Sequence, residues 1–332
     1  MLFFLLSILL LSFNVLLSQK TPLKITFDAL IKKLQTNEKL KLISIAGADN
    51  EQVLKTIRRI KDMKIADSIL VGVKEKIIEK AKAANVDISD FQIIDVEDDD
   101  SKIALEAVKL VHDHKADMYM KGSIQTRDIL RAILNKNVGL RTHHTLSMSA
   151  VFEIEGLDKT VIITDPSVIP YPTLDDKVQL IKNAVFVANA LGIESPKVAA
   201  LTAIEFVNPL IKETVEALEL TKMNEQGDIK GCIIDGPLSL DLAIDKESAK
   251  FKNAMNRKIV GDADILLFPD IHSANFINKV FTSKLVKSKS GTIIAGTTAP
   301  VILTSRSDSE NVKFNSIILA SIYAEFLNEK NK

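Results

Sequence analysis

The segment from Val301 to Ser309 places a hydroxyl, a guanidinium and a carboxylate directly after an apolar run. It reads VILTSRSDS, so Ser305, Arg306 and Asp308 follow the end of an expected buried strand. Arginine offers a planar fork of donors that suits phosphate. A serine hydroxyl can donate to a developing oxyanion, and a nearby carboxylate can take a proton from a nucleophile. A plain turn needs no arginine here, so the segment indicates catalysis or anion binding.

A second polar segment leaves another expected strand, in MYMKGSIQTRDILRAIL. Its first polar residues are Lys121, Gly122, Ser123 and Thr126. Either hydroxyl can cap the helix that follows. Arg127 and Arg131 are four residues apart and share one face of that helix. Arg127 fits a solvated helix residue, whereas Arg131 fits a ligand as well as a surface residue.

Three more expected strands end in an aspartate. VIITDPS contains Asp165, CIIDGP contains Asp235 and ILLFPDI contains Asp270. Because ligands of open parallel sheets bind beyond the carboxyl ends of the strands, we expect these five polar strand ends to line one cleft. Turn chemistry is the alternative explanation for Asp165 and Asp235.

Metal and thiol chemistry receive little support from the residue types. Asp262, Asp264 and Asp270 are spread along a strand and a turn, which favours solvated loops over one ion site, and we expect no metal. The five histidines form no H-E-x-x-H pattern. Cys232 is the one cysteine, so an intrachain disulfide is excluded and a small core residue is expected.

Composition indicates a soluble globular protein. The chain has 332 residues, 46% apolar and 26% charged, which is enough for roughly two domains with full cores. The chain has 43 Lys+Arg and 43 Asp+Glu residues, so its formal net charge is zero. A zero net charge gives no overall electrostatic attraction for nucleic acid. Low cysteine use agrees with the cytoplasm.

Residues 1–20 differ from the rest of the chain. They read MLFFLLSILLLSFNVLLSQK, a nearly unbroken apolar run without a preceding cation. The run lacks a clean signal-peptide pattern and has the minimum length of a membrane span. Three interpretations stay open: an export signal or anchor, an artefactual extension, and an unusual soluble tail.

The elements that must position the polar segments alternate along the chain. Strands are expected at 41–48, 67–73 and 92–96, separated by helices whose apolar residues recur on one face, such as Val53, Ile57 and Ile60. The same rhythm restarts after residues 133–144, the best hinge candidate. Thr173 is expected to cap a helix that ends at Gly192. This βαβα pattern predicts an α/β fold of mostly parallel sheets with helices on both faces.

With these residues in view, the chain resembles the phosphate acetyl/butyryl transferase family, most closely its butyryl branch. The resemblance covers about residue 24 to the end. It lies in KGSIQTRDILRAILNKNVGLR, KVQLIKNAVFVANALGIESPKVA, KMNEQGDIKGCIIDGPLSLDLAI, DADILLFPDI and APVILTSRSDS.

The resemblance implies two α/β domains with the site in the cleft between them, as in the isocitrate and isopropylmalate dehydrogenase architecture. The first domain takes residues 21–140 and 300–332, and the second takes 141–299. The implied reaction is acyl-CoA plus phosphate giving acyl phosphate plus free CoA, and the reverse, by direct thiol attack in a ternary complex. CoA is a substrate, and no tightly bound cofactor is expected. A homodimer or higher oligomer and an acyl-phosphate-using kinase as functional partner are also implied.

The family's Ser-Arg pair falls on Ser305 and Arg306, which implies that Arg306 holds the phosphoryl group and Ser305 stabilises the oxyanion. Arg131 falls on a second phosphate clamp. The other implied substrate-binding residues are Lys121, Gly122, Ser123, Thr126, Arg141, Asp235, Asp270 and Asn275.

Two departures from the family pattern affect the site. The base of the acetyl branch falls on Val312, so Asp308 or Glu310 must act instead, and we choose Asp308. Ala274 replaces a family glycine, which weakens the assignment of Asn275. Two rival functions stay open: a metal- and NAD-dependent decarboxylating dehydrogenase of related fold, and a non-catalytic relative that binds CoA or an acyl phosphate.

Overall fold

A single sheet of eleven strands runs through the molecule. The computed structural model describes residues 25–305 and 308–330. The strand order is β3-β2-β1-β4-β11-β10-β5-β6-β9-β7-β8. The predicted α/β class with a mostly parallel sheet and helices is confirmed. The division into two domains stays a prediction, because β10 pairs with both β11 and β5 and so joins the two halves of the sheet.

The strands fall into three groups. One half contains β1 (Lys41–Ala46), β2 (Ala66–Gly72), β3 (Gln92–Asp95), β4 (Met118–Lys121) and β11 (Val301–Ile302). The centre contains β5 (Ser147–Ile154) and β10 (Ser288–Ala295). The other half contains β6 (Val161–Thr164), β7 (Lys197–Leu201), β8 (Ile233–Leu238) and β9 (Ile265–Leu267).

The direction of the strands reverses at the centre of the sheet. Strands β3, β2, β1, β4 and β11 are mutually parallel. Strand β10 is antiparallel to β11 and to β5, and β5 is antiparallel to β6. Strands β6, β9, β7 and β8 are again mutually parallel. The parallel strands of the two halves therefore run in opposite directions.

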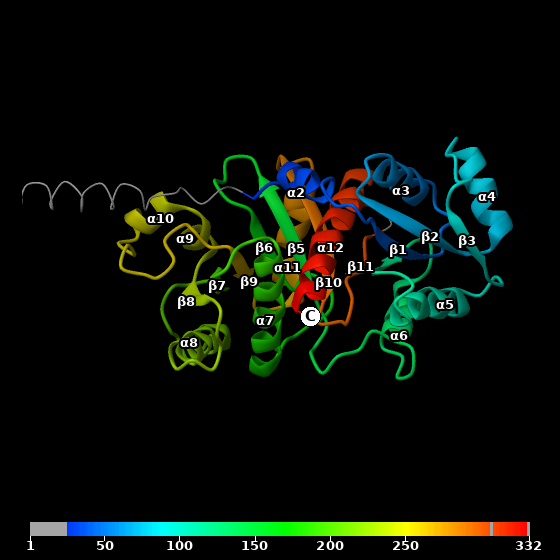
Figure 1. The fold of residues 1–332 in the computed structure, drawn as a ribbon. Coiled ribbons are helices and arrows are strands. Elements are labelled where there is room, and N and C mark those ends of the chain that lie inside the picture. The colour runs from blue at the N-terminus through cyan, green and yellow to red at the C-terminus, as the bar shows by residue number, and fades with distance from the viewer. Residues whose placement is uncertain (1–24, 306–307, 331–332) are drawn as a thin grey trace, which may run out of the picture.

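Helices cover both faces of the sheet (Figure 1). One face packs against α2 (Phe27–Leu34), α3 (Glu51–Asp62), α4 (Lys74–Ala83), α7 (Leu174–Ala190), α8 (Lys212–Glu225) and α12 (Glu310–Lys330). The opposite face packs against α5 (Asp100–His112) and α6 (Thr126–Ile133) in one half, and against α9 (Leu240–Ile244), α10 (Lys246–Phe251) and α11 (Ile271–Thr282) in the other. Neighbours such as Ile45 and Ala46 belong to different core clusters, because side chains alternate across a strand.

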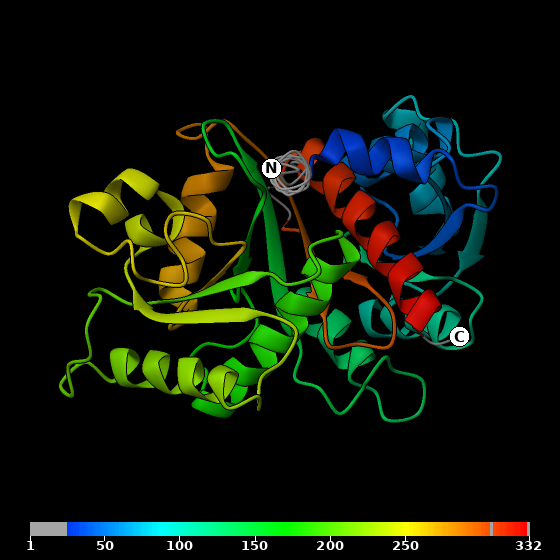
Figure 2. The same ribbon diagram turned by 60° about the vertical axis from the view of Figure 1, so that its left-hand side comes forward.

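Helix α12 is the element that packs against both halves. It contacts α2 and α3 of the first half and α7 of the second, and it lies along β10. Figure 2 shows α12, in red, beside α2, in blue. Its middle is buried on all sides, from Lys313 to Ala324, as expected for a helix that is enclosed by other elements.

The local signals in the sequence are confirmed where they were strongest. Helix α7 begins after Thr173, which forms a reciprocal capping box with Asp176. Gly192, with φ of +93°, follows its end. Val53, Ile57 and Ile60 are all fully buried.

The apolar tail at residues 1–20 lies outside the described residues. Within 25–305 and 308–330, no helix has the length and apolar character needed to cross a membrane.

Candidate active site

The polar segments after β4 and β11 meet at one edge of the sheet. Ile302 lies beside Met120, and Lys121 lies beside Ala46 of β1. Because these strands are parallel, the residues that follow them leave at the same edge. Lys121-Gly122-Ser123 and Thr304-Ser305 are therefore neighbours. The sequence predicted both segments, and the structure brings them together.

Gly122 allows β4 to end in close contact with β1. Its N–H donates to the carbonyl of Ala46 at 2.8 Å, and the Ser123 N–H donates to that of Gly47 at 2.8 Å. A Cβ atom on Gly122 would lie 1.9 Å from the Gly47 oxygen, far inside van der Waals contact. A residue without a side chain is therefore required at this position.

Asp49 lies at the same edge, although the sequence did not single it out. It follows β1, and its Oδ1 accepts a hydrogen bond from the Ser123 hydroxyl at 2.5 Å. Its neighbour Asn50 caps α3 by accepting from the Val53 N–H at 3.0 Å. The signal was present, because AGADN places polar residues directly after a strand, as KGS does.

After β11, Ser305 and Asp308 are joined to each other by two hydrogen bonds. The Ser305 N–H donates to Asp308 Oδ2 at 2.7 Å, and the Asp308 N–H donates to the Ser305 carbonyl at 3.2 Å. No described residue donates to the second oxygen of Asp308, Oδ1. Arg306, the predicted phosphate ligand, lies outside the described residues. Hydrogen bonds therefore connect Ser305 and Asp308, and Arg306 lies between these two residues in the sequence.

Three helix N-termini and a buried lysine lie at this edge, beside the Asp49 and Asp308 carboxylates. Helices α3, α6 and α12 begin directly after the segments that follow β1, β4 and β11. Helix N-termini carry unsatisfied N–H groups and partial positive charge, so they favour anions. Lys121 is only 4% exposed and brings a basic side chain to this edge. The edge is suited to a phosphate group.

Helix α6 carries two exposed arginines around a buried carboxylate. Arg127 Nε lies 3.3 Å and Arg131 Nη1 lies 3.6 Å from Asp128 Oδ1. Both arginine side chains are 70% exposed, whereas Asp128 is buried. Thr126, the first helical residue, is exposed as well. Arg131 is therefore placed beside solvent on the helix that begins at this edge.

That the five polar strand ends line one cleft stays a prediction, because the sheet by itself brings only the segments after β4 and β11 to one edge. Strands β6, β8 and β9 run opposite to β4 and β11, so Asp165 and Asp270 follow their strands at the other edge, whereas Asp235 lies inside β8. The reversal comes from the antiparallel strands β5 and β10, which the alternating sequence pattern does not reveal.

Asp165 and Asp270 order the backbone at that second edge. Asp165 is buried and accepts N–H groups from Met148, Ser167, Val168 and Ile169. Burial raises the pKa of Asp165, and these four donors oppose that shift. Asp270 caps α11 through the Ser273 N–H at 2.9 Å.

Asn275 and Val168 connect the loop after β6 to its surroundings. Asn275 Nδ2 donates to the Pro166 carbonyl at 2.9 Å, which ties α11 to the loop. Val168 packs against the core cluster of the first half that contains Leu303. The loop after β6 therefore reaches the first half, although its strand ends at the far edge.

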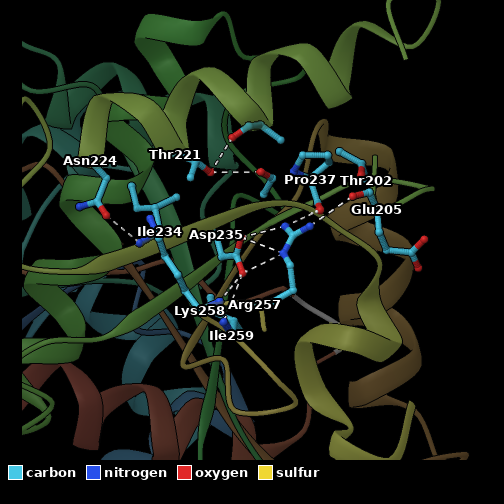
Figure 3. A network of polar contacts seen from close by, with 12 residues as sticks. Thr202, Glu205, Thr221, Asn224, Ile234, Asp235, Pro237, Arg257, Lys258 and Ile259 are labelled. Carbon is cyan, nitrogen blue, oxygen red and sulfur yellow. Dashed lines mark hydrogen bonds and ion pairs between the residues drawn. The ribbon is translucent and has the colours of Figure 1, made fainter. Parts of the chain in front are cut away.

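Asp235 is engaged in an ion pair in the second half (Figure 3). Arg257 Nη2 lies 2.8 Å from its Oδ1, and the Lys258 and Ile259 N–H groups donate to its Oδ2 at 3.0 and 3.2 Å. Arg257 also donates to the carbonyls of Pro237 and Glu205. Five strands separate β8 from β11, which is about 30 Å across the sheet. The structure does not bring Asp235 to Ser305.

Replacing Arg257 by methionine is expected to lower the free energy of unfolding by about 2–4 kcal/mol, because it leaves the Asp235 carboxylate largely buried without its cation. Urea unfolding measures this loss. Lys258→Met is the matched control, since it removes a neighbouring exposed pair with Glu225 and is expected to cost at most about 1 kcal/mol. Equal losses in both variants would contradict a stabilising role for the Asp235–Arg257 pair.

Arg141 is also separated from Ser305. It pairs with Thr297, next to the start of β11, whereas Ser305 follows the end of that strand. It lines a cavity of about 550 Å³ together with Lys136, His112 and Pro300. The sequence-predicted substrate role of Arg141 therefore has no support from proximity to the candidate site.

The acidic residues considered as metal ligands form ion pairs with lysines or cap a helix. Asp262 pairs with Lys197, and Asp264 lies 2.6 Å from Lys159. Over the described ranges, no group of three His, Cys, Asp or Glu side chains is arranged to hold a metal ion. The acidic set behind the dehydrogenase alternative does not assemble.

Cys232 does not have the character of a nucleophile. It is buried, and burial raises the pKa of its thiol to about 11. A thiol with that pKa is almost fully protonated at neutral pH. The chain's one cysteine is therefore poorly suited to carry an acyl group.

Comparisons with known proteins agree on one family. The family profile described as "Phosphate acetyl/butaryl transferase" matches residues 26–104 and 100–321. The chain is 44% identical to the phosphate butyryltransferase of Clostridium acetobutylicum over 90% of its own length and 98% of that protein. It is 40% identical to the phosphate acetyltransferase of Thermotoga maritima over 86% of its length and 95% of that protein. Among solved structures, a branched-chain phosphotransacylase from Enterococcus faecalis V583 superposes with a TM-score of 0.75 at 32% identity, covering 86% of this chain and 99% of the other.

Proposed function

Because this chain belongs to the phosphate acetyl/butyryl transferase family, we propose that it moves a short acyl group, preferably butyryl, reversibly between coenzyme A and inorganic phosphate. The protein is thus an acyltransferase. The observation that supports the proposed site is the edge where Lys121-Gly122-Ser123, Ser305 and three helix N-termini come together.

The reaction needs both substrates at this edge together. In one direction the CoA thiol, after losing its proton, attacks the acyl-phosphate carbonyl; a C–S bond forms, the C–O bond to phosphate breaks, and phosphate leaves. In the other direction a phosphate oxygen attacks the thioester and CoA leaves as the thiol. Holding both substrates in one ternary complex supplies the entropic share of the rate.

The roles of the residues are assigned as follows. Arg306 binds the phosphoryl group with a bidentate fork, and Arg131 assists it as a second cation. Ser305 stabilises the oxyanion of the tetrahedral intermediate. Asp308 accepts the thiol proton, a role that suits a carboxylate next to Ser305 and Arg306 in the chain. Lys121, Gly122, Ser123 and Thr126 form the wall of the phosphate site.

A direct assay tests the function. Purified protein is mixed with butyryl-CoA and phosphate, and free thiol is followed with a chromogenic disulfide. We expect thiol release that depends on phosphate, with omission of phosphate as the control against simple thioester hydrolysis. No release from acetyl-, butyryl- or isobutyryl-CoA would reject the proposal, and tight CoA binding without release would instead indicate a non-catalytic binding protein.

Several finer assignments belong to the same proposal. We place the enzyme in the cytoplasm as a homodimer or higher oligomer, working with a kinase that uses the acyl phosphate. CoA is a substrate, with no tightly bound cofactor. The active site is proposed to lie between two domains, residues 21–140 with 300–332 and residues 141–299.

A further inference from the structure

Lys313 is a buried cation directly behind the turn after β11. It is the fourth residue of α12 and is 3% exposed. Lysine is rarely buried without a paired carboxylate. The first turn of a helix is also the wrong end for a cation, because the helix N-terminus is itself partly positive. The position therefore needs a specific explanation.

Among the described residues, Lys313 donates to neutral oxygen atoms. Its Nζ donates to Gln52 Oε1 at 3.0 Å and to the main-chain carbonyl of Asp308, and it lies 3.5 Å from the carbonyl of Ser305. No carboxylate oxygen of a described residue lies within 4.0 Å of it. Burial lowers the pKa of Lys313, and the negative charge of the nearby Asp308 carboxylate opposes that shift.

These contacts fasten the turn at both ends. The two carbonyls belong to Ser305 and Asp308, the residues that flank Arg306 and Ser307. The same pair is already joined by the mutual hydrogen bonds of the turn. Gln52 lies in the first turn of α3, so Lys313 also links the start of α3 to the turn.

We propose that Lys313 is the positioning residue of the phosphate site: it fixes Ser305 and Asp308 relative to each other and to α3, and its charge strengthens binding of the phosphate dianion. The inference rests on the proposed function and deepens it. Lys313 acts from behind the turn and touches no substrate. A lysine with only a structural role would affect stability but would not distinguish phosphate from acyl-CoA.

The test compares Lys313→Met, Lys313→Gln and the control Lys177→Met. Lys177 is a similarly buried lysine, 4% exposed, but it is ion-paired with Glu216 at 2.5 Å and lies in α7. The readouts are the KM values for phosphate and for butyryl-CoA, and the rise in melting temperature with added inorganic phosphate. The second readout does not depend on turnover.

For Lys313→Met we expect the KM for phosphate to rise about 10- to 100-fold, the effect of losing a charge-assisted interaction, with the KM for butyryl-CoA changed less than about threefold. The phosphate-induced rise in melting temperature should shrink in parallel. Lys313→Gln keeps donors for the carbonyls without the charge, so its KM for phosphate should fall between wild type and Lys313→Met. Lys177→Met should lower the melting temperature and leave both KM values unchanged.

Each outcome decides the inference. Unchanged KM values, or two KM values raised by the same factor, would overturn the inference. If Lys313→Met does not fold, the KM values of Lys313→Gln are used for the same comparison. Absence of thiol release in the wild-type protein would reject the proposed function. The role of Lys313 in binding phosphate would then be tested by the phosphate-induced rise in melting temperature, compared between wild type and the Lys313 variants. A wild-type enzyme that is active, combined with variants that bind phosphate normally, would reject only the role of Lys313.

Discussion

Arg306→Ala is expected to lower kcat with butyryl-CoA and phosphate by about 10²–10³-fold, while the melting temperature stays nearly unchanged. The physical reason is that the fork of Arg306 neutralises the charge that gathers on phosphate as the C–O bond breaks. Steady-state thiol release and thermal unfolding of the same preparation measure the two quantities. Arg306→Lys should recover part of the loss, because it keeps the charge but loses the bidentate geometry.

Arg127→Ala provides the matched control for this experiment. Arg127 is an exposed arginine, 70% accessible, whose partner is its own neighbour Asp128. We expect its removal to leave kcat within about twofold, as for an exposed surface pair. A large melting shift in Arg306→Ala would mean that the arginine is structural, and a kcat unchanged from wild type would remove it from the mechanism.

Asp308→Asn is expected to lower kcat by about 10²-fold or more, which is the contribution of a positioned general base. Asparagine can still accept the Ser305 N–H through its amide oxygen, so the turn is expected to persist and the loss to report the missing charge. Steady-state thiol release measures the loss, and thermal unfolding of the same variant checks that the turn persists.

Glu310→Gln separates the two candidate bases. Glu310 is half-exposed, and its Oε1 lies 3.7 Å from Arg59 on α3. We expect its kcat to stay within about threefold of wild type, since the exposed pair contributes little. A large loss in Glu310→Gln with an active Asp308→Asn would reassign the base, and two active variants would mean that neither carboxylate removes the thiol proton.

Much of the candidate site could be recognised from local sequence. The segments KGS and TSRSDS each follow an apolar run, and parallel neighbours leave a sheet at the same edge, so their proximity follows from the fold class. Asp49 follows β1 in the same way but was not among the predicted residues. Its Oδ1 accepts a hydrogen bond from the Ser123 hydroxyl.

The sequence by itself determined the family, the α/β class, the caps of α7 and the apolar faces of the helices, because these depend on contacts a few residues apart or on long matched segments. It could not determine which strand ends meet. That depends on β5 and β10, whose antiparallel pairing joins residues more than 130 positions apart, such as Ser288 and Ile154, and reverses the second half of the sheet.

Only the tertiary structure could therefore decide that Asp235 pairs with Arg257 far from Ser305, and that Lys313 is enclosed behind the turn after β11. Both outcomes depend on which distant groups surround a charge once the chain is packed. The composition of the neighbouring sequence does not encode that environment, because burial and ion pairing are properties of the assembled core.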